Sequence, residues 1–176
     1  GNLTLLLSFS IYGVSLVLLF TISTLYHSFY RPKLKTLFKL LDHIAIYLLI
    51  ASTYTPLMLV SVKTINGILI LGFVWFLASL GTLSEVYLKG RTVKIIQTLV
   101  YLSMGWVCAF DLSALKVALG DAAFFWVLLG GLSYTAGLFF YLADKLNRLE
   151  HAHGIWHFFV LLGAFTHFIA IIGFVR

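Results

Sequence analysis

Two histidines open the last apolar stretch of the chain and are the residues best placed to do chemistry. His153 and His157 are four residues apart, so on a helix they lie about one turn apart on the same face. At this spacing two imidazoles can bind one metal ion. The pair therefore predicts a metal site whose remaining ligands come from other parts of the chain.

The other candidate ligands are few, because the chain has six histidines and six carboxylates. His27 ends the first apolar stretch, and Asp42 opens the second after a short basic connection. Ser23 lies four residues before His27 and shares its helix face. If the first and last stretches cross a membrane in opposite directions, these residues lie at the depth of His153 and His157.

The metal expected at three histidines is zinc. Three protein ligands leave a fourth tetrahedral position for a water, as in catalytic rather than structural zinc sites. Imidazoles also bind iron, nickel and copper, and the sequence does not rank these metals.

The step from His153 to His157 has Gly154 where the His-Glu-x-x-His signature of zinc proteases has its base. The base must therefore come from another helix. Asp42 could orient the metal-bound water and take its proton, while Ser23 could bond the water or a developing oxyanion.

Each of these residues also has a plain structural interpretation. A serine in a membrane helix often bonds its own backbone. His27 could be an interfacial histidine, and Asp42 could pair with Lys39 or Arg31. The combination, rather than any one residue, indicates a site.

The remaining polar residues are weaker candidates. His43 is rotated about 100° from Asp42, and His151 is off the face of His157, so both are expected at the interface or around the site. Ten residues beyond His157, His167 is about 15 Å deeper and is predicted to be a buried, hydrogen-bonded histidine. Glu85 is expected to pair with Lys89 one turn later.

Composition places the elements that carry these residues in a membrane. Of the 176 residues 61% are hydrophobic and 10% are charged, with a mean hydropathy of +1.04. The net charge of +6 comes from short connections, which indicates topology rather than nucleic-acid binding. The fold class expected is all-α, a polytopic transmembrane helix bundle.

Six apolar stretches are each long enough to cross a hydrocarbon core of about 30 Å, namely 3–26, 41–60, 68–88, 93–110, 122–142 and 153–175. Short connections predict one domain, 1–176. Pro56 predicts a kink or a hydrogen-bond gap within the second stretch.

Basic residues favour one side of the membrane. Nine of the twelve lie in the first, third and fifth connections, and they are Arg31, Lys33, Lys35, Lys39, Lys89, Arg91, Lys94, Lys145 and Arg148. By the positive-inside rule these connections are cytoplasmic, and so is the proposed metal site.

Four segments resemble one known family, the bacterial hemolysin III proteins of the progestin and adiponectin receptor (PAQR) superfamily, which is related to the alkaline ceramidases. The segments are Ser-Thr-Leu-Tyr-His (23–27), the stretch from Leu41 to Pro56, Tyr-Leu-Ser-Met-Gly-Trp (101–106) and His-Gly-Ile-Trp-His-Phe-Phe-Val (153–160). The resemblance implies zinc bound by His27, His153 and His157, with Asp42 holding the zinc water and Ser23 close by. Family members usually have seven spans, so a first span is expected to be missing here.

Three functions are compatible with this pattern. The first is zinc-dependent hydrolysis of a lipid amide or ester, with a membrane lipid as substrate and ceramide-like lipids suggested by the resemblance. The second is a receptor-like sensor or membrane homeostasis protein with structural zinc. The third is a cytolytic pore, which the absence of a charged ring along one face disfavours. Neither the substrate nor the oligomeric state follows from the residues.

Overall fold

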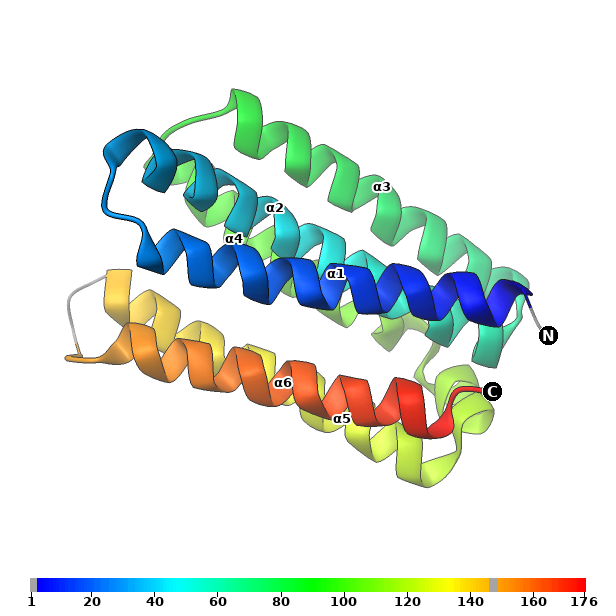
Figure 1. Ribbon diagram of the computed structural model, residues 1–176. Coiled ribbons are helices and arrows are strands. Elements are labelled where there is room, and N and C mark those ends of the chain that lie inside the picture. The colour runs from blue at the N-terminus through cyan, green and yellow to red at the C-terminus, as the bar shows by residue number, and fades with distance from the viewer. Residues whose placement is uncertain (1–2, 146–148) are drawn as a thin grey trace. The chain divides into compact units, whose positions relative to one another are not determined.

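The computed structural model describes residues 3–145 and 149–176, and within them it contains helices and no strand (Figure 1). Arg148, one of the basic residues of the fifth connection, lies outside the described residues. The elements in chain order are α1 (Leu3–Ser28), α2 (Pro32–Pro56), a π-helix η1 (Leu57–Val62), α3 (Ile65–Tyr87), α4 (Arg91–Trp106), a 3₁₀-helix η2 (Val107–Asp111), α5 (Leu112–Lys145) and α6 (Ala152–Phe174).

Among the described residues, five segments are long and apolar enough to cross a membrane. The longest, Thr92–Asp144, has 53 residues, whereas one crossing takes about 20. It contains both predicted stretches 93–110 and 122–142, and Gly120, at φ 73°, breaks the helix between them. The all-α transmembrane fold class is therefore confirmed, and this segment is long enough for two of the six predicted crossings.

The chain forms two compact units, Gly1–Asp111 and Leu112–Arg176. The prediction of one domain over residues 1–176 stays a prediction.

In the first unit, α2 begins nine residues earlier than predicted. The basic segment before position 41 is helical from Pro32 onward rather than a loop. Proline is well suited to a helix start, because its fixed φ fits and its missing N–H has no partner there anyway. Asp42 therefore lies ten residues inside α2, not at its opening turn.

Contacts between α1 and α2 nevertheless keep Asp42 level with the end of α1. Phe29, just past α1, stacks on Phe38 with ring centroids 5.1 Å apart, and one turn further along α2 Asp42 acts electrostatically on Tyr26. The two helices are thus antiparallel: a residue of α1 faces the residue of α2 for which the two residue numbers add up to about 67 or 68. The first two turns of α2 extend beyond the end of α1.

A partly buried polar network joins α2, α3 and α4. One carboxylate oxygen of Glu85 lies 3.2 Å from Nδ1 of His43, and the other accepts the hydroxyl hydrogen bond of Tyr101 at 3.1 Å. Tyr101 is also 3.2 Å from the carbonyl oxygen of His43. The predicted pairing of Glu85 with Lys89 is replaced by these contacts, because Glu85 faces the neighbouring helices and Lys89 lies beyond the end of α3, where it is exposed.

Pro56 marks a change of helix type within the second stretch. It lacks the N–H that would continue the α-helical ladder, and the next residues adopt the π-helix, which ends where the N–H of Lys63 bonds the carbonyl of Met58 at 3.0 Å. The predicted hydrogen-bond gap at Pro56 is thus resolved by wider turns.

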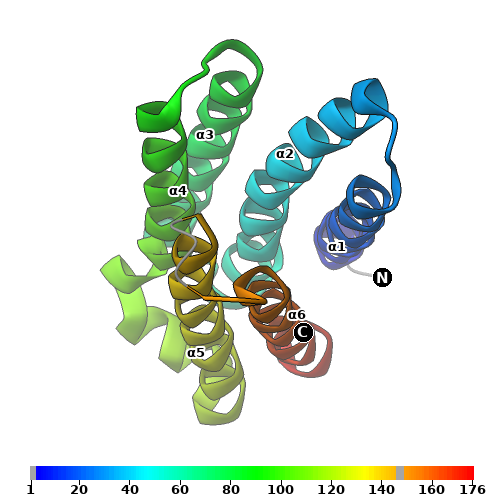
Figure 2. The same cartoon turned by 90° about the vertical axis from the view of Figure 1, so that its left-hand side faces the viewer.

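The second unit is a pair of closely packed helices, α5 and α6, which lie side by side in both views (Figure 1, Figure 2). Glycines make the approach close, as is common between membrane helices. A Cβ at Gly130 would clash with the ring of His167, and one at Gly163 would come within 2.9 Å of the Tyr134 ring. His167 is partly buried and is hydrogen-bonded at 3.0 Å to the carbonyl of Val127, so it has the predicted hydrogen bond but not the full burial.

Candidate metal centre

His153 and His157 lie on one face of the first two turns of α6, as their spacing predicts. Helix α6 begins at Ala152, directly after His151, whose positive φ of 61° turns the chain into the helix. The Nε2 atoms of His153 and His157 are 3.1 Å apart, and the two rings are nearly perpendicular, at 84°. Both side chains are only partly buried, so a ligand can reach them.

The separation of these two nitrogens fits a shared metal ion. Zn–N bonds of about 2.0–2.1 Å at a tetrahedral angle hold two ligand nitrogens about 3.3 Å apart. At 3.1 Å the two atoms are also within hydrogen-bond distance, with one Nε2 carrying a proton and the other accepting it. A metal would therefore bind with little movement of the rings and would displace one proton.

A carboxylate stands on the other side of His153. Oδ2 of Asp144, in the last turn of α5, lies 3.3 Å from Nδ1 of His153. The Nδ1 atom is the ring nitrogen not facing His157, so His153 contacts a carboxylate with one nitrogen and an imidazole with the other. This is the arrangement in which an imidazole can donate Nδ1–H and keep the Nε2 lone pair available.

The other predicted site residues lie together in the first unit. Ser23 and His27 are one turn apart at the end of α1, where the ring of Tyr26 lies 4.7 Å from that of His27. Because Asp42 acts on Tyr26, its carboxylate is at the same level of the α1–α2 pair. His27 is exposed, and Ser23 and Asp42 are partly buried.

A hydrogen bond from the side chain to its own helix backbone, the structural alternative for Ser23, is made by the neighbouring Thr24. Thr24 Oγ1 bonds the carbonyl of Phe20 at 2.7 Å. Within the described ranges, Ser23 makes no such bond.

The five predicted site residues thus fall into two groups. Ser23, His27 and Asp42 belong to the first unit, and His153 and His157 belong to the second. The structure brings the residues together within each group. A single site formed by all five stays a prediction.

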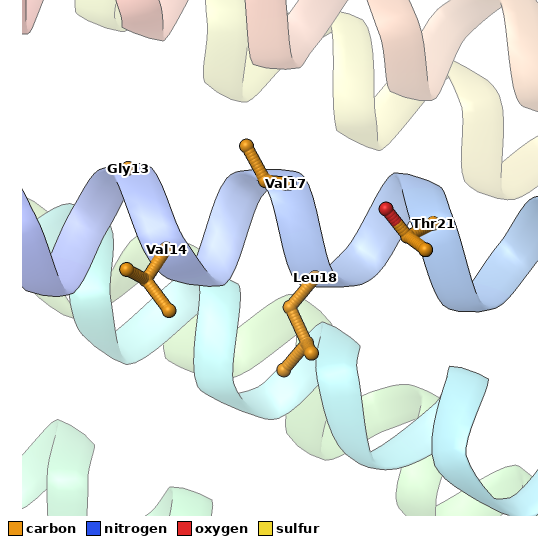
Figure 3. Close-up of a pocket in the computed structure, with 5 residues that line it drawn as sticks. All are labelled: Gly13, Val14, Val17, Leu18 and Thr21. Carbon is orange, nitrogen blue, oxygen red and sulfur yellow. The ribbon is translucent and has the colours of Figure 1, made fainter.

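A depression along α1 is chemically unlike these groups. Its lining residues all come from α1, as Figure 3 shows, and they are Gly13, Val14, Val17, Leu18 and Thr21. A Cβ on Gly13 would meet nothing within 4 Å, which makes the surface shallow and open there. Apart from the Thr21 hydroxyl the lining is apolar, so this surface suits a lipid chain rather than a reaction.

Comparison with known proteins identifies the family. The sequence model of haemolysin-III-related proteins matches residues 4–168. This chain belongs to the haemolysin-III-related family. It is 39% identical to Hemolysin-3 of Bacillus cereus over 175 residues, covering 99% of this chain and 78% of that protein. It is also 39% identical to the Hemolysin-3 homolog of Bacillus subtilis over 167 residues, covering 95% and 76%.

The haemolysin-III relationship extends to animals. Human monocyte to macrophage differentiation factor is 31% identical over 168 residues, covering 92% of this chain and 67% of that protein. The family resemblance drawn from the sequence motifs is confirmed. The residues carrying that resemblance, including Ser23, His27 and the His153–His157 step, all lie inside the segment matched by the haemolysin-III model.

Sequence reasoning did not identify Asp144 as a site residue. It is a carboxylate at the end of an apolar stretch, nine residues before His153, and its position there was the available signal. A contact between side chains on two different helices has no fixed sequence spacing, unlike the contact between His153 and His157 on one helix.

Proposed function

We propose that this chain is a zinc-dependent intramembrane hydrolase that cleaves an amide or ester bond of a membrane lipid. The observation that carries the proposal is the 3.1 Å separation of the His153 and His157 Nε2 atoms, which is close to the separation that one zinc ion imposes. His27 is the third ligand in this proposal, because it is the histidine that the family motif places with Ser23.

Each remaining residue has a role in the proposed reaction. Zinc, when bound, would supply a water acidic enough to act as the nucleophile near neutral pH. Asp42 accepts the proton of that water and returns it to the leaving group. Ser23 donates a hydrogen bond to the carbonyl oxygen of the substrate as negative charge develops on it. The partial burial of Ser23 and Asp42 supports a position beside apolar substrate chains.

A lipid is the substrate class that suits this location. His27 lies one residue before the end of α1, and His153 is the second residue of α6, so both lie near the ends of apolar helices. An amphiphile can place its chains among such helices while its polar bond reaches the helix ends. Ceramide-like amides are the first lipids to test, on the family resemblance.

The basic connections support a position of the proposed site on the cytoplasmic side of the membrane. Reporter fusions after Lys35 and Arg91 should report the cytoplasm, and fusions after Lys63 and Lys116 the outside. The reverse pattern would place the proposed site at the outer face.

Metal content is the direct test of the proposal. The purified full chain should contain about one zinc per molecule, and zinc affinity should fall with pH, because protons compete for the histidine nitrogens. Lipid extracts incubated with the zinc-loaded protein should then be searched for released fatty acid. A protein without metal after mild purification, and without zinc binding when zinc is added, would refute the proposal.

The names of two relatives favour cytolysis as a second candidate function. Hemolysin-3 of Bacillus cereus is named for lysis of blood cells, and a pore would produce ion conductance when this chain is added to planar bilayers.

A sensor with structural zinc is separated from the hydrolase by Asp42→Asn, which should leave a sensor's function unchanged.

A further inference from the structure

Asp144 and His153 join the two helices of the second unit at their connected ends. Asp144 is one residue from the end of α5, and His153 is the second residue of α6. Their 3.3 Å contact is between side chains that are 32% and 39% exposed. Both side chains are exposed enough for water to solvate a charge on them. Burial therefore does not explain why they pair.

The contact sets which way the two nitrogens of His153 face. Its Nδ1 atom lies 3.3 Å from the Asp144 carboxylate, and an ionised carboxylate accepts hydrogen bonds and does not donate them. This neighbour favours the tautomer that carries its proton on Nδ1. The other nitrogen, Nε2, lies 3.1 Å from Nε2 of His157, on the side where a metal shared with His157 would bind.

We infer that Asp144 is a positioning residue for the metal site: it holds His153 in the tautomer and ring orientation that bind the metal through Nε2. Carboxylates hydrogen-bonded to metal-binding histidines fix the ring in this way and increase its basicity, and their loss typically lowers metal affinity about 10- to 100-fold. The inference rests on the proposed function, since it requires a metal at His153 and His157.

The test measures zinc affinity of the full chain in detergent micelles by competition with a chelator. Asp144→Ala should weaken zinc binding about 10- to 100-fold. Asp144→Asn should give an intermediate value, because its amide oxygen still accepts from Nδ1–H but carries no charge. Asp121→Ala is the matched control on the same helix: Asp121 pairs with Lys116 at 3.4 Å and is 89% exposed, and its loss should leave the zinc affinity unchanged.

A second readout uses the metal-free protein. In ¹⁵N-histidine spectra, His153 should show the Nδ1–H tautomer in the parent chain and a larger share of the Nε2–H tautomer in Asp144→Ala, with the His153 signals assigned from their loss in His153→Gln. An unchanged zinc affinity in Asp144→Ala would overturn the inference while the proposed metal site stands. A parent chain that binds no zinc would overturn the proposed function, and this inference with it.

Discussion

A histidine–carboxylate pair in the first unit and another in the second are nearly alike in length. Nδ1 of His43 lies 3.2 Å from Glu85, and Nδ1 of His153 lies 3.3 Å from Asp144. Their surroundings differ. The side chains of the first pair are 21% and 8% exposed, against 39% and 32% in the second.

The second contacts of each pair differ as well. The other oxygen of Glu85 accepts a hydrogen bond from Tyr101, so the polar atoms of this more buried pair join three helices. The other nitrogen of His153 faces His157. The distance between histidine and carboxylate does not tell a structural pair from one in a candidate site. The contacts of the other ring nitrogen and the other carboxylate oxygen distinguish the two.

The largest expected difference between the pairs is in metal binding. His157→Ala removes one of the two facing nitrogens and should weaken zinc binding by on the order of 10³-fold or more. His43→Ala should keep the parent affinity. Zinc titration of both variants checks this. Equal losses would mean that His43 contributes to zinc binding as much as His157 does.

A smaller effect separates catalysis from metal binding. Asp42→Asn preserves the shape of the side chain but cannot accept a proton, so lipid hydrolysis should slow by on the order of 10²-fold while zinc is retained. The measurement is the initial rate of fatty-acid release, with the metal content determined on the same sample. Loss of zinc in this variant would instead make Asp42 a direct ligand.

Loss of the His43–Glu85 pair should lower stability and leave zinc binding unchanged. Glu85→Ala removes the acceptor facing Nδ1 of His43, while Tyr101 keeps the carbonyl of His43 as an acceptor, and an unsatisfied buried group costs about 1–3 kcal/mol. The free energy of unfolding should fall by that amount in denaturant titrations, with zinc affinity unchanged. Asp144→Ala is the natural control, because its partly exposed pair should cost less stability.

His167 provides the smallest expected effect and a check on the second unit. Its hydrogen bond to Val127 lies far from His157 along α6, so His167→Ala should retain zinc and lose only about 0.6 kcal/mol, the average for such bonds between membrane helices. The same unfolding titration measures this. A loss of zinc in His167→Ala would show that the two helices transmit packing changes to the metal site.

Local patterns explain which parts of the structure could be predicted. The apolar stretches predicted the helices, because backbone groups in a membrane must bond within their own segment. The helix ends were less predictable. Proline at position 32 and the lysines after it continue α2 beyond the membrane core, where helix formation no longer requires apolar residues.

The membrane helices, the family and the shared face of His153 and His157 could be predicted, because each depends on composition, on motifs or on the fixed period of one helix. The partners of Glu85 and His153 could not be predicted and are known from the fold. Those contacts join residues on different helices, and their geometry is set by how the helices pack, including the close approach at Gly130 and Gly163. No spacing along the chain encodes that packing. Glu85 and Asp144, each near the end of an apolar stretch, therefore have different environments in the fold.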